Sequence, residues 1–255
     1  MTTILETKDL RKEYGALVAV DNVSLEITEH SLHSIIGPNG AGKTTLFNLL
    51  SGTVKPTSGS VLFRGNDITG IPAYKTIRHG IGRSYQITNV FPNLTVFENV
   101  RLAAQALGRD NFKFWNSVAT FPDVLERTSE VLEMVGLTAD SHKMANALPH
   151  SDQRNLELGM ILAPDPDVLL LDEPTAGMAS NQVPDLMALI AQIQQAGNKT
   201  IVLVEHNMNV VMEVSDRITV MHQGAILAEG TPDEIGTNEH VQKAYLGSLY
   251  DEDEE

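Results

Sequence analysis

The sequence predicts an α/β fold with a mostly parallel central sheet, a smaller antiparallel patch of strands and an inserted group of helices. Three mostly apolar segments, 32–36, 168–171 and 200–204, are typical of buried parallel strands. Residues 23–27 alternate between apolar and polar side chains, which predicts a strand with one exposed face. From Thr95 onward the apolar positions recur at helical spacing, which predicts helices between the second and third groups of strands.

The composition is that of a folded protein without a membrane span or a secretory signal. The chain has 255 residues, 42% of them hydrophobic, which is enough for a well-filled core in one compound domain or two small ones. No segment approaches the ~18 consecutive apolar residues of a membrane span, and residues 1–15 lack the apolar stretch of a signal peptide. The absence of cysteine excludes disulfides, thiolate zinc sites and cysteine nucleophiles. We therefore expect a cytoplasmic protein, unless a partner holds it at a membrane.

The charge of the chain is strongly acidic. Its 18 basic and 33 acidic side chains give a formal net charge of −15. This balance argues against broad electrostatic binding to nucleic acid or to an anionic lipid surface. The five consecutive acidic residues at 251–255 contribute to the excess and are interpreted as a solvated, disordered end.

The N-terminal segment is predicted to form strands. Apolar residues group at 4–5, at 18–20 and at the alternating positions of 23–27. Tyr14 directly precedes Gly15, so we expect it on a loop between two of these strands. From its position alone, Tyr14 is interpreted as an ordinary half-buried tyrosine.

A glycine-rich loop lies between the apolar segment 32–36 and a predicted helix at 46–50. The loop consists of Gly37, Pro38, Asn39, Gly40, Ala41, Gly42, Lys43, Thr44 and Thr45. Its glycines, lysine and threonine match a loop whose backbone N–H groups wrap a phosphate chain at a helix N-terminus. Lys43 would contact the β and γ phosphates, and the Thr44 hydroxyl would bind Mg²⁺. The sequence therefore predicts a P-loop NTPase that binds a nucleoside triphosphate.

After this loop the chain returns to strands and then becomes helical. Turn residues bracket a strand predicted at 60–63, and Gly80 opens a short strand that leads to Gln86. Helical periodicity then covers 96–104 and 124–135. Between these two stretches cluster the aromatic residues Phe112, Phe114, Trp115 and Phe121. We interpret this cluster as a local aromatic core under a loop, with a docking surface as the alternative.

Two carboxylates, Asp172 and Glu173, stand at the carboxyl end of the apolar run 168–171. Burying carboxylates there is costly unless they hold a cation or transfer a proton, and open α/β sheets bind ligands at this edge. Asp172 is therefore predicted to hold Mg²⁺ through water. Glu173 is predicted to polarise the attacking water, a role typically worth ~10²–10⁴ in rate. His206 follows the strand at 200–204 in the same way and is predicted to face the γ phosphate.

The remaining chain is predicted to add a helix, two short strands and the final helices. The helix spans about 183–195, and the strands cover 217–220 and 225–227 around a turn at 222–224. Turn and helix-start residues open the last helices, which occupy 230–246. No internal repeat is visible.

The order of these motifs resembles one family closely. A tyrosine before the first loop, GPNGAGKTT, a glutamine after GIGRSY, a helical insertion, VLLLDEPTAGM and VLVEH are together similar to the nucleotide-binding subunit of an ATP-binding cassette (ABC) transporter. The resemblance covers about 5–246. It implies a RecA-like ATP-binding core with an antiparallel β subdomain over 1–91 and 161–246, a helical signature subdomain over 92–160, and a disordered acidic tail over 247–255.

The resemblance also implies a role for each matching residue. Tyr14 looks like the aromatic residue on which adenine stacks. Gln86 looks like the glutamine that reaches Mg²⁺ and the attacking water and links the helical subdomain to the membrane partner. Asp172 matches the acid that organises Mg²⁺, Glu173 matches the catalytic base, and His206 matches the switch histidine that contacts the γ phosphate. The resemblance thus implies that the chain binds ATP and Mg²⁺ and hydrolyses ATP.

The signature sequence departs from the family pattern. In this family two subunits close face to face, and each nucleotide lies between one phosphate loop and the opposite subunit's signature, usually LSGGQ. The aligned stretch here is 148–154, where Pro149 replaces the usual serine and Ser151 the second glycine. Pro149 has neither the serine hydroxyl nor a backbone N–H, while Ser151 is expected to cap the helix that begins there. Residues 178–181 also lack the usual leucine and aspartate.

We hypothesise from this departure that one composite ATP site of the assembled protein is weakened. The partner would then be a second, non-identical ABC ATPase subunit with an intact signature. The resemblance further implies two membrane permease subunits, an indirect extracellular substrate-binding protein and a peripheral position on the cytoplasmic face of the cell membrane. It implies no nucleic-acid partner.

The ending narrows the resemblance to one group within the family. The stretch DRITVMHQGAILAEGTPDEI followed by VQKAYLG is similar to the branched-chain amino acid uptake group, whose relatives import urea or amides. The leading expectation is an ATPase that powers an importer for branched-chain or other hydrophobic amino acids. A urea or amide importer is one alternative, and the altered signature favours another, a slowly hydrolysing regulatory subunit. A soluble ABC ATPase of DNA repair, translation or cluster assembly is disfavoured by the single cassette, the lack of a coiled-coil insertion and the acidic charge.

Overall fold

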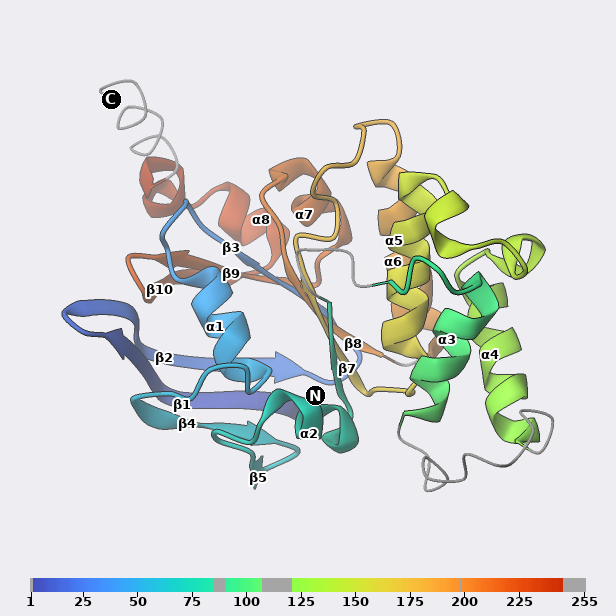
Figure 1. The fold of residues 1–255 in the computed structure, drawn as a ribbon. Helices are drawn as coiled ribbons and strands as arrows, with labels where there is room; N and C mark the ends of the chain where they lie inside the picture. The colour runs from blue at the N-terminus through green and yellow to red at the C-terminus, as the bar shows by residue number, and fades with distance from the viewer. Residues whose placement is uncertain (1, 85–89, 107–120, 198, 245–255) are drawn as a thin grey trace.

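The computed structural model describes residues 2–84, 90–106, 121–197 and 199–244. The strands are β1 (Thr3–Tyr14), β2 (Leu17–Thr28), β3 (Leu32–Ile36), β4 (Ser58–Phe63), β5 (Asn66–Asp67), β6 (Ile81–Arg83), β7 (Val168–Asp172), β8 (Thr200–Val204), β9 (Arg217–His222) and β10 (Ala225–Gly230). The helices are α1 (Lys43–Leu50), α2 (Ala73–Thr76), α3 (Val96–Gln105), α4 (Pro122–Met134), α5 (His150–Leu162), α6 (Val183–Gly197), α7 (Met208–Val214) and α8 (Pro232–Gly236). This mixture of sheets and helices confirms the predicted α/β class (Figure 1).

The central sheet has six strands in the order β10-β9-β3-β8-β7-β6. All five residues of each of β3, β7 and β8 are buried, which explains their apolar sequences. These three strands pair in parallel, so their carboxyl ends meet at one edge of the sheet. The predicted segment 200–204 coincides with β8, whereas β7 runs one residue further than predicted because Asp172 still pairs with Val204.

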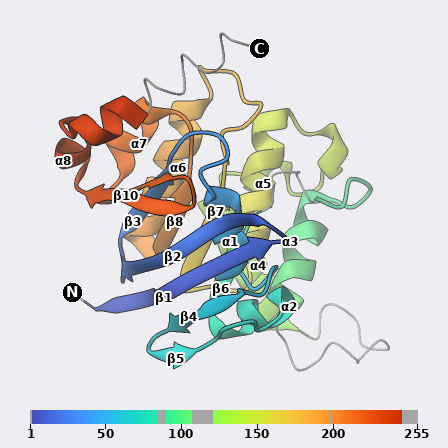
Figure 2. The same ribbon diagram turned by 90° about the vertical axis from the view of Figure 1, so that its left-hand side faces the viewer.

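The smaller sheet is antiparallel and has the order β2-β1-β4-β5. Figure 2 shows β1, β2 and β4 in front of the rest of the molecule. The hairpin of β1 and β2 is much longer than the short segments that the sequence predicted. Its two strands stay paired across polar residues, with several shifts of register along the hairpin. Tyr14 was expected on a loop, but it is the last residue of β1 and pairs with Leu17. The correction moves Tyr14 from the turn into the strand that precedes it.

Helices α3, α4 and α5 pack against one another beside the central sheet (Figure 1). Their apolar faces share a hydrophobic cluster with β7, β8 and α6. The cluster includes Val96, Val100, Val131, Leu132, Leu156, Leu162, Leu169 and Ile190. The helices therefore share one continuous core with one face of the sheet.

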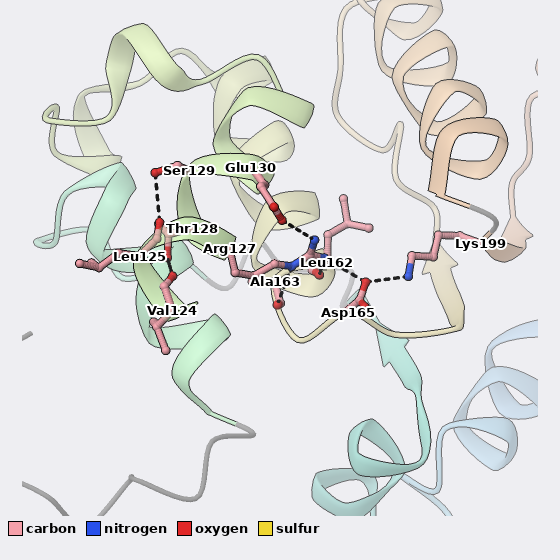
Figure 3. A network of polar contacts seen from close by, with 10 residues as sticks. All are labelled: Val124, Leu125, Arg127, Thr128, Ser129, Glu130, Leu162, Ala163, Asp165 and Lys199. Atoms are coloured by element: carbon pink, nitrogen blue, oxygen red, sulfur yellow. Dashed lines mark hydrogen bonds and ion pairs between the residues drawn. The ribbon is translucent and has the colours of Figure 1, made fainter. Parts of the chain in front are cut away.

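Arg127 of α4 joins these helices to the central sheet through polar contacts (Figure 3). Its guanidinium donates to the carbonyl oxygens of Leu162, at 2.8 Å, and Ala163, at 3.3 Å. These carbonyls lie at the C-terminal end of α5, where the helix itself supplies no partners. Asp165 accepts hydrogen bonds from Arg127, at 3.1 Å, and from Lys199, at 2.8 Å, next to the start of β8. Arg127 therefore caps α5 and links it to the sheet.

The start of α5 differs from the sequence expectation. Ser151 was expected to cap this helix, but α5 begins at His150 and its N-cap residue is Pro149. Among the described residues no side chain caps the helix, and the Ser151 hydroxyl instead donates to the neighbouring Asp152 carboxylate at 3.4 Å. The extended backbone of Pro149, with φ −54° and ψ 156°, suits the residue before a helix, so the N-cap lies two residues earlier than expected.

Two further sequence expectations concern the aromatic cluster and a membrane-spanning segment. Phe112, Phe114 and Trp115 of the aromatic cluster lie outside them, and only Phe121, the residue before α4, is described. Within the described ranges, no helix combines the length and apolar character needed to cross a membrane.

Candidate functional site

The glycine-rich loop connects β3 to α1 at the carboxyl edge of the central sheet. Gly42 has φ +97°, and a Cβ atom there would meet the backbone oxygen of Ala19 in β2. Gly37 has φ +151°, and a Cβ atom there would meet the backbone oxygen of Met221 in β9. Both glycines are therefore required by positive φ and by the close approach of neighbouring strands.

The loop leaves several of its residues at the surface. Pro38, Asn39, Gly40 and Ala41 line an open pocket of about 470 Å³ together with residues of the turn between β9 and β10. Thr44 is exposed and Thr45 partly buried in the first turn of α1. An open loop followed directly by a helix N-terminus is suited to an anion.

Lys43 folds back over the loop and is only 6% exposed. Its ammonium group donates to the backbone oxygens of Gly37, at 2.7 Å, and Pro38, at 3.0 Å. Burial lowers the pKa of Lys43, and the carboxylates of Glu173 and Asp172 oppose that shift. The three side chains thus interact electrostatically, although they come from α1, β7 and the residue after it.

Asp172 ends β7 with its side chain only 1% exposed. Its backbone N–H donates to the Ser84 hydroxyl at 2.9 Å, and its Oδ2 accepts from Arg83 Nη2 at 3.3 Å. Its Oδ1 is buried and has no hydrogen-bond partner among the described residues. Burial raises the pKa of Asp172, and the positive charge of Arg83 opposes that shift.

Glu173 and His206 are in direct contact at the same edge. Glu173 Oε1 lies 2.7 Å from His206 Nε2, and the Glu173 backbone N–H donates to the Val204 oxygen at 2.9 Å. Glu173 has φ +49°, an uncommon conformation for a residue other than glycine. The sharp turn after β7 therefore directs the glutamate toward the end of β8.

Sequence reasoning missed two polar residues beside this edge. Glu205 is 3% exposed and accepts hydrogen bonds from the Thr175 backbone N–H, at 3.0 Å, and hydroxyl, at 2.6 Å. Arg83 in β6 contacts Asp172, as described above. An arginine in a segment predicted as a short strand was the only available signal for Arg83.

Two predicted site residues are not among the contacts described above. Tyr14 is 46% exposed at the end of β1, with the Lys12 ammonium 4.9 Å from the centre of its ring. Gln86 lies outside the described residues.

The residues at the sheet edge fit a Mg²⁺ ion bound together with a nucleotide. The described residues contain no group of three or more His, Cys, Asp or Glu side chains that could hold a metal alone. Mg²⁺ typically takes only one or two protein ligands when phosphates supply others. Asp172 offers a buried oxygen to which no described residue is hydrogen-bonded, and Thr44 offers a hydroxyl in the first turn of α1. Such a donor set suits a metal shared with a phosphate chain.

This chain is similar in sequence to known proteins of one family. Residues 20–176 match the ABC transporter family, and residues 225–250 match the branched-chain amino acid ATP-binding cassette transporter family. LivG of Salmonella typhimurium, a high-affinity branched-chain amino acid transport ATP-binding protein, is 41% identical, with 96% of this chain and 98% of LivG covered. BraF of Pseudomonas aeruginosa, which has the same description, is 40% identical over the same shares of both chains.

Solved structures show the same likeness. The ADP conformation of an ATP-binding cassette of an ABC transporter superposes with a TM-score of 0.85 at 28% identity, covering 97% of this chain and 100% of that chain. A dimeric structure of a bacterial ABC transporter cassette gives a TM-score of 0.75 at 28% identity, covering 90% of this chain and 99% of that chain.

Proposed function

This chain belongs to the ABC transporter family, and from that premise we propose that it is the ATP-hydrolysing subunit of an importer for branched-chain or other hydrophobic amino acids. ATP binding and hydrolysis follow from the family, and dependence on Mg²⁺ is part of the proposal. The observation that supports it most directly is the meeting of Lys43, Asp172, Glu173 and His206 at one sheet edge beside the phosphate loop.

The phosphate loop would hold the triphosphate of ATP. Backbone N–H groups of 37–45 would bind the phosphate oxygens at the N-terminus of α1. Lys43 would exchange its bonds to the Gly37 and Pro38 oxygens for bonds to the β and γ phosphates. The exposed ring of Tyr14 would stack on the adenine.

Glu173 would act as the base that polarises the attacking water. Its contact with His206 holds one carboxylate oxygen, which leaves the other for the water. His206 is 46% exposed at the side chain and would reach the γ phosphate in the closed protein. Asp172, Thr44 and Gln86 would hold Mg²⁺, which when bound neutralises charge on the phosphates.

The class of transported substrate is supported by the C-terminal part of the chain. Residues 225–250 match the branched-chain amino acid cassette family, and relatives named for branched-chain amino acid transport are 40–41% identical over nearly the whole chain. The cassette itself contacts no transported substrate in the proposed assembly. We therefore place the importer for urea or amides second.

The proposed assembly contains two cassettes and two membrane permease subunits at the cytoplasmic face of the membrane. The cassette would divide into a RecA-like core with its antiparallel subdomain, over 1–91 and 161–246, and a helical subdomain, over 92–160. The second cassette is proposed to be non-identical because Pro149 and Ser151 occupy the signature of this chain. An extracellular binding protein would deliver the substrate.

Uptake of labelled leucine and of labelled urea by a strain lacking this chain tests the substrate class. Restored leucine uptake on re-expression supports the proposal, and restored urea uptake alone rejects it in favour of the second candidate. The ATPase activity of the isolated chain and of the reconstituted complex tests the enzymatic role. Nucleotide binding without hydrolysis in either would instead support a regulatory subunit, the function that Pro149 and Ser151 favour.

A further inference from the structure

Arg83 is a buried charge at the junction of three elements. It is the last residue of β6, at the edge of the central sheet, and its side chain is only 9% exposed. Its guanidinium lies between the carboxylate of Asp172 at the end of β7 and the C-terminal end of α1. An arginine is costly to bury unless its donors are used, so the contacts indicate what it does there.

One end of the guanidinium is fixed to α1 and the residues after it. Nη1 lies 2.7 Å from Asn48 Oδ1 and 2.6 Å from Ser51 Oγ, with Thr53 Oγ1 at 3.2 Å. These acceptors are uncharged: Asn48 lies in the last turn of α1, the helix that the phosphate loop opens, and Ser51 and Thr53 follow that helix. The guanidinium is therefore anchored to the C-terminal end of α1 and the residues after it.

The other end of the guanidinium contacts Asp172. Nη2 donates to Oδ2 at 3.3 Å, while Ser84 next to Arg83 accepts from the Asp172 backbone N–H at 2.9 Å. Arg83, which ends β6, and Ser84, which follows it, thus hold one carboxylate oxygen and the backbone N–H of Asp172. The second oxygen, Oδ1, is buried without a partner among the described residues.

We propose that Arg83 is a positioning residue for the metal site: it fixes the Asp172 carboxylate through Oδ2 and so reserves Oδ1 for the cation. The inference rests on the proposed function, because it requires that Asp172 serve a divalent cation bound with the nucleotide. The planar fork of arginine suits this task, since it spans from the α1 acceptors to Asp172 with separate nitrogens. Partners that orient a metal-binding carboxylate typically change metal affinity 10–100-fold when removed.

A purely structural role would have a different outcome. If the sole role of Arg83 is to tie α1 to the sheet, its loss would lower the stability of the fold without changing the affinity for the cation. Arg127 provides a matched control, because it is also a part-buried arginine that bonds the end of a helix, here the Leu162 and Ala163 oxygens of α5 (Figure 3). In the part of the chain that the structure describes, Arg127 bonds no atom of Asp172.

The test measures Mn²⁺ binding by electron paramagnetic resonance to the full-length chain saturated with a non-hydrolysable ATP analogue. Arg83→Gln is expected to raise the Mn²⁺ dissociation constant about 10–100-fold. Its affinity for the nucleotide in EDTA is expected to stay at the wild-type value. Arg83→Lys should also bind Mn²⁺ more weakly, because one ammonium group cannot reproduce both ends of the fork. Arg127→Gln should bind Mn²⁺ like the wild type.

A second variant covers the case in which Arg83→Gln does not fold. The double change Asn48→Ala and Ser51→Ala leaves the arginine and Asp172 in place and removes the anchors on α1. It is expected to weaken Mn²⁺ binding in the same direction. Wild-type Mn²⁺ affinity in either folded variant would overturn the inference. If the wild-type chain binds the nucleotide analogue but takes up no added Mn²⁺, the Mg²⁺ dependence in the proposed function is rejected instead.

Discussion

His206 Nε2 and Glu173 Oε1 lie 2.7 Å apart, although 33 positions separate the two residues in the sequence. Each follows a buried strand, and these strands, β7 and β8, are parallel neighbours. The contact therefore arises because adjacent parallel strands end at the same edge. It holds one carboxylate oxygen of Glu173 beside the end of β8.

Replacing Glu173 with glutamine is expected to lower the ATPase rate of the reconstituted complex by ~10²–10⁴, because the amide cannot accept a proton from water. The change is nearly isosteric, so ATP binding should remain. Phosphate release under saturating ATP, together with equilibrium nucleotide binding, separates the two effects. Unchanged hydrolysis in the variant would show that Glu173 is not the base.

Replacing Lys43 with alanine is expected to weaken ATP binding about 10–100-fold, since hydrogen bonds to charged groups contribute roughly 1.5–3 kcal/mol. Transport should be crippled as a result. Binding of a fluorescent ATP analogue to the full-length chain measures the loss. Lys143→Ala is the control, because Lys143 is an exposed lysine paired with Asp140 at 2.6 Å and should leave binding intact. Equal affinity in the Lys43 and Lys143 variants would reject the role of Lys43.

The free energy of unfolding is expected to fall at acid pH because of His33 in β3. Its side chain is buried, its Nε2 lies 2.7 Å from Thr219 Oγ1, and burial, aided by the charge of Arg217, lowers its pKa to about 4. The folded pKa lies below the unfolded value, so the histidine is neutral in both states above about pH 6.5. As the pH falls from about 6.5 to about 4, only the unfolded chain binds the proton, and the free energy of unfolding drops by up to about 3 kcal/mol.

Urea denaturation between pH 7 and pH 4 measures this effect as a difference between the wild type and His33→Gln. Glutamine does not titrate in this range and preserves a polar group near Thr219. The wild type is expected to lose more stability than the variant as the pH falls. Parallel curves for the two proteins would show that His33 contributes nothing to the pH dependence.

The central strands could be predicted because full burial leaves an unambiguous apolar pattern. The segment 200–204 matches β8 at both ends for this reason. The hairpin of β1 and β2 could not be predicted at its full length, because its half-exposed strands carry charged residues and shift register repeatedly. The α/β class therefore depended on the buried strands and not on the hairpin.

The candidate site shows a similar division. Asp172 and Glu173 were recognisable because carboxylates seldom follow four buried apolar residues without a reason. The contact of Arg83 with Asp172 was not recognisable, because it joins residues 89 positions apart and depends on the packing of β6 against β7. The N-cap of α5 was misplaced by two residues, at Ser151 in place of Pro149, because proline can also precede a helix. The roles of the site residues in hydrolysis remain predictions.

The signature offers a change that should increase activity. Pro149 precedes α5 without a side-chain cap, and no hydroxyl stands where the family has its serine. The double change Pro149→Ser and Ser151→Gly supplies that hydroxyl and a backbone N–H. If the composite site lacks one transition-state donor, hydrolysis there should rise by up to ~10²–10³. Steady-state ATPase activity of the complex with its second cassette measures the gain.

A matched variant separates this gain from a simple effect on folding. Pro149→Ala with Ser151→Gly restores the backbone N–H but not the hydroxyl, so it should recover less activity. Serine at the N-cap position also stabilises a helix by about 1 kcal/mol relative to alanine, and thermal unfolding of both variants measures that contribution. Faster hydrolysis only in the serine variant, beyond any difference in folded fraction, would assign the effect to the hydroxyl. If both variants assemble and hydrolyse ATP at the wild-type rate, the altered signature does not limit the reaction, and the case for two unequal sites is lost.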